Sequence, residues 1–462
     1  MISRENATFL LGVIAVLYLG AAALYAVNTP PWQAPDEPAH YNYVRQIVEE
    51  DCCPVNAAGD WDSAHLETLK SEGFPEGADL SAIQYEDHQP PLYYLLAAPV
   101  YRATGGSLVA LRLLSVVFGL GVVLAAYYTV LRLLPERPVL ALGAALVAAF
   151  VPQHVAIMAS VNNDSLAEML MGIIFVVAIT YLRNPSKRNK DGTVTPFDVS
   201  HLPHAAALGG LVGAAYLTKM TIYLPATLVV AAAILLRWLV EKAPLRWLVL
   251  EGLWAALMAA GLGSIWWARN VILYGWPDLF GQIAHLSVVQ GQLRTADYIA
   301  SVGTSAYVQS ALKTTYQSFW GQFGWMGVPM PPREYIAIGA FLLIALAGFV
   351  LLVTAYRRRL ALNVYQRAGI GVMVLGALAT LAGYVYYNVT FVQFQGRYLF
   401  PLLIPFALFV VLGLTGVQYI LEVWLKGRAW DRRLNWLPVI GVSWMPLLSL
   451  FALFNYVLPN LR

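Results

Sequence analysis

A proline-rich segment near the start of the chain carries two adjacent carboxylates and a histidine: Pro30-Pro31-Trp32-Gln33-Ala34-Pro35-Asp36-Glu37-Pro38-Ala39-His40. A carboxylate can act as a general base that takes a proton from a nucleophile. The four prolines keep the segment out of regular helix, because each fixes φ and lacks a backbone N–H. The pattern indicates either a catalytic carboxylate or a polar loop whose acidic residues cap the next helix.

The composition decides where this segment lies. Hydrophobic residues make up 59% of the 462, charged residues 12%, and the mean hydropathy is +0.61. A soluble domain carries roughly a quarter charged residues, so we predict an all-α, multi-pass integral membrane protein forming a single polytopic domain over residues 1–462. The small net charge of +3 gives no indication of a nucleic-acid partner. The first apolar run lacks a small-residue cleavage site and is expected to be a retained span.

A membrane span needs about 20 apolar residues. This rule predicts about eleven transmembrane helices, over residues 8–27, 107–131, 138–158, 164–182, 203–218, 221–240, 247–268, 335–356, 368–387, 398–421 and 436–457. The segment 91–104 is apolar but too short to span, and Gly105 and Gly106 end it. We expect it to form an interfacial helix with its tyrosines at headgroup depth.

Loop charges test this topology. With the N-terminus placed inside, every inner loop is rich in Lys or Arg: Arg132, Arg137, Arg183, Lys187, Arg188, Lys190, Lys242, Arg246, Arg357, Arg358, Arg359, Arg367, Lys426, Arg428, Arg432 and Arg433. A full span at 91–104 would move the later basic loops to the wrong side. The prediction is therefore a plasma-membrane protein with a cytoplasmic N-terminus and two large outer loops, 28–106 and 269–334. Asp36 lies in the first of them.

The predicted outer ends of the spans collect polar residues, which are costly at such depth and tend to be functional or paired. They are Asp36, Glu37, His40, Glu86, Asp87, His88, Gln89, Arg112, Asn162, Asn163, Asp164, Lys219, Arg269, Asn270, Gln393, Gln395 and Arg397. Carboxylates with scattered cations can remove a group from a lipid-linked phosphate, since a base activates the nucleophile and cations stabilise the leaving phosphate. Arg397 is the first candidate for the phosphate, because a guanidinium matches its oxygens and Gly396 lets the backbone approach closely. Lys219 is the second.

Each of these residues also has a purely structural interpretation. Arg397 and Lys219 can anchor helix ends by reaching the headgroups. Arg112 can pair with Glu86 or Asp87. Asn163 and Asp164 can cap the following helix. His40 and His88 with Glu37 or Glu86 can hold a divalent metal, although a set without fixed spacing is a weak metal signal.

The two cysteines, Cys52 and Cys53, are adjacent. Neighbouring cysteines rarely bridge each other without strain, and two thiols make no metal site. We therefore assign them no role and assign no metal ligand to the chain. A divalent cation remains a possible cofactor, and no other cofactor is expected.

Taken in order, the motifs resemble the GT-C glycosyltransferase superfamily, and most closely the bacterial relatives of the protein O-mannosyltransferases and of the lipid A aminoarabinose transferase. The resemblance covers about residues 30–405. It rests on Asp36-Glu37-Pro38-Ala39-His40, His88-Gln89-Pro90-Pro91-Leu92-Tyr93-Tyr94, Ser160-Val161-Asn162-Asn163-Asp164, Phe319-Trp320-Gly321-Gln322-Phe323-Gly324-Trp325 and Gln395-Gly396-Arg397-Tyr398. It implies a GT-C bundle with interfacial helices in a large first outer loop.

The resemblance also implies roles for individual residues. Asp36 would be the catalytic base, and Glu37 would position the acceptor or support the base. Donor phosphate binding falls to Arg397, Lys219 and Arg269, and substrate positioning to His40, His88, Tyr93, Asn163, Asp164 and Gln395. Gln89 stands where the superfamily often has His, which weakens the role of His88. The shortness of the chain beyond 457 leads us to expect no large C-terminal soluble domain.

The leading hypothesis is an inverting glycosyltransferase on the outer face of a bacterial plasma membrane. It would use a polyprenyl-phosphate sugar and an acceptor glycan, lipid or protein, among membrane lipids. A transporter or flippase for lipid-linked sugars is the alternative, as is a non-catalytic protein that binds them. A transporter needs polar groups at mid-membrane depth and often paired broken helices, whereas the charges here gather at one face.

Overall fold

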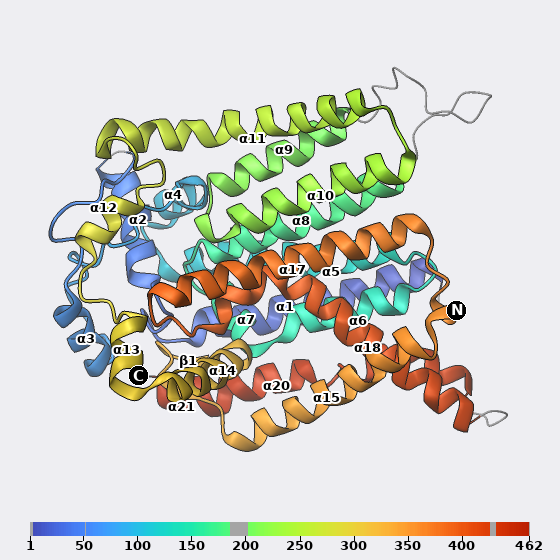
Figure 1. Cartoon of the computed structure of the whole chain (residues 1–462). Coiled ribbons are helices and arrows are strands. Elements are labelled where there is room, and N and C mark those ends of the chain that lie inside the picture. Colours follow the sequence, from blue (N-terminus) through green and yellow to red (C-terminus); the bar gives the residue numbers. More distant parts are fainter. Residues whose placement is uncertain (1–2, 51, 185–201, 426–430, 462) are drawn as a thin grey trace.

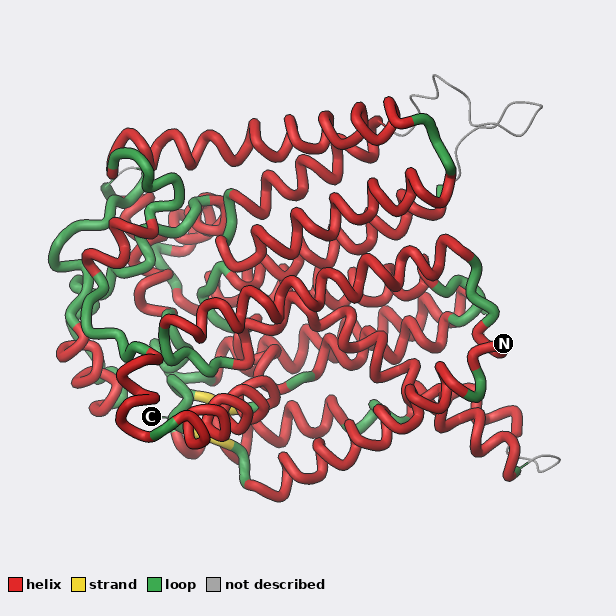
Figure 2. Tube along the Cα trace, in the orientation of Figure 1, coloured by secondary structure: helices red, strands yellow, loops and turns green. Residues whose placement is uncertain are grey.

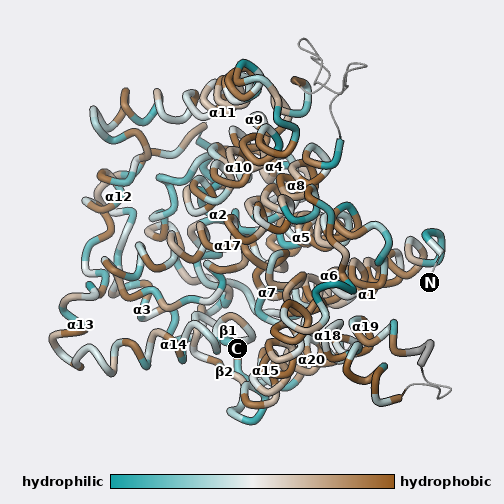
Figure 3. Tube along the Cα trace, turned by 45° about the vertical axis from the view of Figure 1, so that its right-hand side comes forward, coloured by the Kyte–Doolittle hydropathy of each residue, from teal (hydrophilic) through white to brown (hydrophobic). Residues whose placement is uncertain are grey.

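The computed structural model describes residues 3–50, 52–184, 202–425 and 431–461, and these are almost entirely helical (Figures 1 and 2). Within these ranges, nine helices are long and apolar enough to cross a membrane, and a bent pair brings the number to as many as ten. The hydrophobic residues run along these helices, and hydrophilic residues gather in the loops at their ends (Figure 3). The chain is therefore a multi-pass membrane protein, as predicted.

The bundle consists of α1 (Arg4–Asn28), α5 (Leu108–Leu133), α6 (Pro138–Phe150), α7 (Pro152–Met158), α8 (Asp164–Arg183), α9 (Leu202–Tyr216), η2 (Met220–Ile222), α10 (Tyr223–Glu241), α11 (Leu245–Tyr274), α15 (Pro332–Thr354), α16 (Arg357–Leu360), α17 (Val364–Thr390), η3 (Gly396–Leu402), α18 (Leu403–Trp424), η4 (Asp431–Trp436), α19 (Leu437–Ile440), α20 (Met445–Ala452), η5 (Leu453–Val457) and α21 (Leu458–Asn460). The two large loops add α2 (Glu37–Glu49), α3 (Ser63–Glu72), α4 (Leu92–Thr104), α12 (Gln282–Val288), α13 (Thr295–Val302), α14 (Thr304–Trp320), and the antiparallel strands β1 (Gln322–Phe323) and β2 (Val328–Pro329).

Each of the eleven apolar stretches predicted from the sequence falls on helix, and the short stretch 91–104 forms α4. Three of the eleven differ from a simple span. α9 has 15 residues. The stretch 138–158 is broken at Val151, where Pro152 begins α7 and the direction changes by 66°. The last stretch is divided among η4, α19, α20 and η5.

α6 has only 13 residues, which is too short to span a membrane by itself. All of its residues except Val139 are buried, and a helix that is apolar on every side belongs inside a bundle. α1, α5 and α18 pack around it. α6 thus forms part of the protein core, and the break after Phe150 turns α7 toward the polar end.

The loops divide between the two ends of the bundle, as Figure 1 shows. One end carries the N-terminus and the connections that follow α5, α10 and α15, which hold the basic residues Arg132, Arg137, Lys242 and Arg357–Arg359. Lys187, Arg188, Lys190, Lys426 and Arg428 lie outside the described residues, as do the side chains of Arg432 and Arg433. The opposite end carries α2, α3, α4, α12, α13 and the C-terminus.

The first large loop holds a feature that the sequence analysis did not anticipate. Cys52 and Cys53 are joined by a disulfide. The side chain of Arg269, at the end of α11, donates hydrogen bonds to the carbonyl oxygens of Cys53 and Pro54. These contacts tie the loop after α2 to the last turns of α11.

Gly396 fixes the start of η3 against α14. A Cβ at this position would overlap the backbone of Phe319, and the Gly396 amide donates to Ser318 Oγ at 2.7 Å. The glycine at position 396 was expected to let the backbone approach a ligand. The segment that it approaches closely is instead the backbone of α14.

The substitution Gly396→Ala should therefore lower the free energy of unfolding by about 1–3 kcal/mol, because the added methyl group overpacks the η3–α14 contact. The measurement is the midpoint of thermal unfolding in detergent. Gly383→Ala on α17 is the matched control, since open space surrounds that position. Equal midpoints for the two variants would contradict the packing argument.

Candidate active site

Asp36 stands at the N-terminus of α2 in the left-handed region, with φ at 66°. Non-glycine residues are uncommon there, and Asp is one of the residues that tolerates it best. The carboxylate forms an ion pair with Arg397 and accepts a hydrogen bond from Tyr85 Oη at 2.7 Å. Its side chain stays 21% exposed, so a ligand can reach it. Burial alone would raise the pKa of Asp36, but the charges of Arg397 and His40 lower it to about 2.

Glu37 has a different environment. It is fully buried, and both of its oxygens accept hydrogen bonds from the Arg112 guanidinium, at 2.8 and 2.6 Å. The backbone amides of Trp32 and Val161 add two more at 3.1 Å. Arg112 also donates to the carbonyl oxygens that end the first span, those of Ala26, Thr29 and Pro30. The structure thus pairs Arg112 with Glu37, and not with Glu86 or Asp87 as the sequence analysis considered.

The tight turn between α9 and η2 places Lys219 against the start of α8. Its ammonium group forms an ion pair with Asp164 at 2.6 Å, and both side chains are nearly buried. Asn162 caps this end of α8, since its Oδ1 accepts from the Asp164 amide at 2.8 Å. The capping role considered for Asn163 and Asp164 therefore falls to their neighbour Asn162.

A hydrogen-bonded path joins these two parts of the site. His40 Nδ1 lies 2.8 Å from Tyr94 Oη, which also accepts from Asn163 Nδ2 at 3.3 Å. Tyr93 Oη accepts from the Asn162 amide at 3.1 Å. Burial lowers the pKa of His40, while the nearby carboxylates of Glu86, Asp36 and Asp164 act in the opposite direction. Tyr93, His40 and Asn163 thus connect the first large loop to the turn before α8.

Six ionisable groups gather at this place. His40 interacts electrostatically with Glu86, Lys219, Asp36 and Asp164. Arg397 interacts with both Asp36 and Asp164. These groups come from α2, the loop before α4, the α7–α8 turn, the α9–η2 turn and η3. The structure therefore brings Asp36, His40, Asp164, Lys219 and Arg397 into one cluster.

Three other candidates have partners other than the Asp36–Arg397 pair, although His88 also interacts electrostatically with Lys219. Arg269 binds the Cys53–Pro54 backbone and stacks on Trp266 at 4.2 Å. His88 packs against the ring of His285 at 3.8 Å, and burial lowers its pKa to about 4. Gln395 donates to Gln393 at 2.9 Å. None of these contacts joins the Asp36–Arg397 pair.

The cluster also contains residues that were not among the predicted catalytic, phosphate-binding or substrate-positioning residues. Tyr85 binds Asp36, Tyr94 joins His40 to Asn163, and Glu86 interacts with Asp36, His40 and Lys219. Tyr387 of α17 interacts with Glu86, Asp36 and Arg397. Glu86 and Tyr94 belong to the recognised polar segment, but no pattern in the sequence singles out Tyr387.

Several buried polar atoms in this cluster lack a hydrogen-bond partner among the described residues. They are Nε and Nη1 of Arg397, Oδ2 of Asp164, Oδ1 of Asn163, Nδ2 of Asn162, Oε2 of Glu86 and Oε1 of Gln89. Buried polar atoms are usually paired, and a ligand can supply the missing partners. The two unpaired nitrogens of Arg397 suit an anion.

A divalent cation finds no prepared ligand set here. In the described part of the chain, no three His, Cys, Asp or Glu side chains converge as metal ligands. The carboxylates of the cluster are instead engaged with Arg397, Lys219 and neutral donors. We therefore derive no step that depends on a metal.

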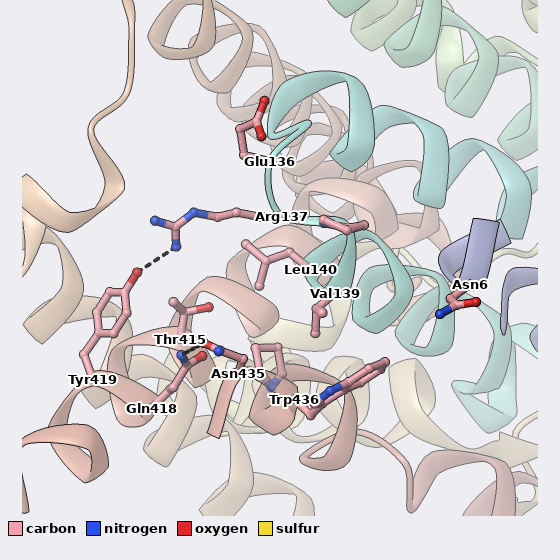
Figure 4. A pocket seen from close by; sticks show the side chains of 12 residues that line it. Asn6, Glu136, Arg137, Val139, Leu140, Thr415, Gln418, Tyr419, Asn435 and Trp436 are labelled. Carbon is pink, nitrogen blue, oxygen red and sulfur yellow. Dashed lines mark hydrogen bonds between the residues drawn. The ribbon is translucent and has the colours of Figure 1, made fainter. Parts of the chain in front are cut away.

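A cavity of about 590 Å³ lies at the other end of the bundle. Figure 4 shows its lining, with the Arg137 guanidinium directed at Tyr419, whose Oη accepts from it at 2.7 Å. Asn6 near the N-terminus and Trp436 also line it. This cavity is at the basic end and is separate from the cluster around Asp36.

Solved structures share this architecture, although no family model and no curated protein matches the chain. The archaeal oligosaccharyltransferase AglB from Archaeoglobus fulgidus, in complex with an inhibitory peptide and a dolichol-phosphate, aligns with a TM-score of 0.50 at 13% identity over 98% of this chain and 56% of AglB. ArnT from Cupriavidus metallidurans bound to undecaprenyl phosphate aligns with a TM-score of 0.47 at 12% identity, over 99% of this chain and 74% of ArnT. The chain thus spans about half the length of AglB. The chain therefore shares the fold of AglB, and its all-α, multi-pass architecture is as expected.

Replacing Arg112 by Leu should lower the free energy of unfolding by about 3–5 kcal/mol, because it leaves the buried Glu37 carboxylate without its cation. Detergent-solubilised yield and the thermal midpoint measure the effect. Arg102→Leu, at an exposed position on α4, is the control and should behave like the wild type. A wild-type midpoint for Arg112→Leu would show that Glu37 does not depend on this pair.

Proposed function

We propose that this chain is an inverting glycosyltransferase that moves a sugar from a polyprenyl-phosphate donor to an acceptor hydroxyl. The observation that carries the proposal is Arg397, a buried guanidinium whose nitrogens Nε and Nη1 are unpaired, beside the partly exposed carboxylate of Asp36. An anion site next to a carboxylate, at the end of a membrane bundle with the GT-C fold, suits a lipid phosphate that bears a leaving sugar. The dolichol-phosphate in AglB and the undecaprenyl phosphate in ArnT are ligands of this chemical class.

The reaction breaks one bond and forms another at the anomeric carbon. The acceptor O–H gives its proton to Asp36, and the oxygen attacks the carbon from the face opposite the phosphate. The carbon–oxygen bond to the phosphate breaks, and its electron pair leaves with the phosphate. Arg397 and Lys219 stabilise the charge on that phosphate. Arg397 lies next to the carboxylate and Lys219 next to Asp164, so the two cations approach from different elements.

Because Asp36 is paired with Arg397, donor binding should also change the basicity of Asp36. In the absence of donor, Arg397 lowers the pKa of Asp36 to about 2, and so acidic a carboxyl group makes a weak general base. The donor phosphate binds the same guanidinium through its unpaired Nε and Nη1, and its negative charge offsets the effect of Arg397 on Asp36. When it binds Arg397, the pKa of Asp36 rises and the carboxylate becomes a stronger base.

The basic loops identify the cytoplasmic side in this proposal. They lie at the end of the bundle that carries the N-terminus, and the Asp36 cluster lies at the opposite end (Figure 1). By the positive-inside rule the cluster faces the outer side of a bacterial plasma membrane. The acceptor is a glycan, lipid or protein that is present on that side.

Transport of a lipid-linked sugar is the second candidate, and one observation favours it. The broken span α6–α7 carries His154, which pairs with Glu168 of α8 at 2.9 Å, and both are buried. Broken helices and intramembrane ionisable pairs are typical of transporters. A proteoliposome assay that follows a fluorescent lipid-linked sugar across the bilayer separates transport from transfer.

In the transfer assay, Asp36→Asn should lower turnover about 10²–10⁴-fold, the usual contribution of a general base. Release of radiolabelled sugar from undecaprenyl-phosphate sugars to water or to added acceptor measures the rate. Asp297→Asn, at an exposed position on α13, should keep the full rate. Wild-type turnover in a folded Asp36→Asn variant would remove Asp36 from the chemistry.

The substitution Arg397→Ala should lower retention of undecaprenyl phosphate at least tenfold, since a charge-assisted hydrogen bond contributes about 1.5–3 kcal/mol. Mass spectrometry of lipids that co-purify with each variant gives the retained fraction. Arg294→Ala removes an exposed arginine from the same outer loop region and serves as the control. Equal retention in all three proteins would place the phosphate elsewhere.

A further inference from the structure

The unpaired atoms of the cluster are of two chemical kinds. Arg397 presents unpaired donors, Nε and Nη1. Glu86 Oε2, Gln89 Oε1, Asn163 Oδ1 and Asp164 Oδ2 present acceptors that receive no hydrogen bond from the described residues. An anion satisfies the first kind, and a group rich in O–H donors satisfies the second. A sugar phosphate carries both.

The acceptor oxygens belong to one place. Gln89 hydrogen-bonds to Glu86, and Glu86 interacts electrostatically with His40 and Lys219. Lys219 pairs with Asp164, and Asn163, its neighbour in the chain, is joined to His40 through Tyr94. The set therefore spans the first outer loop and the α7–α8 turn, with the Asp36–Arg397 pair beside it.

Glu86 differs from the other carboxylates of the cluster. Asp36 is paired with Arg397 and Asp164 with Lys219, whereas no lysine or arginine of the described chain lies within ion-pair distance of Glu86. Glu86 interacts electrostatically with Asp36, His40 and Lys219. It also interacts with the ionisable side chains of Asp87, Tyr85, Tyr94 and Tyr387. An anionic oxygen without a cation is a stronger acceptor for a hydroxyl than a neutral amide oxygen.

We infer that Glu86 recognises the donor sugar by accepting a hydrogen bond from one of its hydroxyls at Oε2, while the lipid phosphate lies on Arg397. The inference rests on the proposed function and assigns the sugar-binding part of the same site. Glu86 is a positioning residue in this arrangement, and the acceptor's proton still goes to Asp36. A site built around a buried charged acceptor discriminates strongly against a ligand that lacks the matching hydroxyl.

The protonation state of Glu86 gives the recognition a pH dependence. Burial and the charge of Asp36 raise its pKa, while His40 and Lys219 act in the opposite direction. As the pH falls through this raised pKa, Glu86 loses the charge that makes it a strong acceptor. Affinity for the sugar-bearing lipid should therefore fall as the pH is lowered through the pKa of Glu86, and affinity for the bare lipid phosphate should not follow this titration.

The test compares two lipids on the full-length protein in nanodiscs. Radiolabelled undecaprenyl phosphate is displaced either by unlabelled undecaprenyl phosphate or by undecaprenyl-phosphate glucose, mannose or N-acetylglucosamine. Glu86→Gln keeps the shape of the side chain and removes its charge. It should weaken the preferred sugar-bearing lipid about 10–100-fold and change the affinity for undecaprenyl phosphate less than threefold. Arg397→Ala should weaken both lipids.

The matched control is Glu76→Gln, at an exposed glutamate of the same outer loop, which should leave both affinities unchanged. A Glu86→Gln protein that binds the sugar-bearing lipid as tightly as the wild type, or that weakens both lipids equally, overturns the role of Glu86 and leaves the proposed function standing. A wild-type protein that prefers none of the three sugar-bearing lipids over undecaprenyl phosphate overturns the sugar site and counts against the proposed function as well.

Discussion

A buried pair between Arg112 and Glu37 determines the geometry on which the rest of the site depends. Its guanidinium holds the carbonyl oxygens at the end of α1, and its carboxylate partner begins α2. The Val161 amide adds the turn before α8. A charge removed from water must be fully paired, since one partner without the other is strongly destabilising. Three segments of the chain are therefore fixed around one side chain of α5.

The adjacent carboxylates of Asp36 and Glu37 lie in different environments. Glu37 has no free oxygen and holds the backbone, whereas its neighbour Asp36 points to Arg397 and remains partly exposed. The left-handed conformation at Asp36 turns the two side chains in different directions. Opposite environments for neighbouring acids are typical of sites in which one acid is structural and the other chemical. Asp164 and Glu86 differ in a similar way: Asp164 is paired with Lys219, whereas no lysine or arginine among the described residues forms an ion pair with Glu86.

The bundle keeps the polar cluster at one end because charge inside a bilayer is costly. The helix pair α6–α7 is bent, and α7 leads directly into the α7–α8 turn, which lies in the polar cluster. α6 can be short because protein surrounds it. The contacts of η3 with α14 and α17 then bring Arg397 to the first outer loop, so the late part of the chain completes a site begun by the early part.

The sequence by itself determined the helices, their membrane character, the two large loops and the identity of Asp36, Lys219 and Arg397 as chemically unusual residues. These features are local: an apolar stretch must span or be buried whatever its neighbours are, and basic loops mark one side. Only the tertiary structure decided the pairings, because Asp36 and Arg397 stand 361 residues apart and no periodicity relates them. It joined Arg112 to Glu37, tied Arg269 to the loop after α2, and brought Glu86 and Tyr387 to Asp36. The partner of a buried charge is chosen by packing in three dimensions.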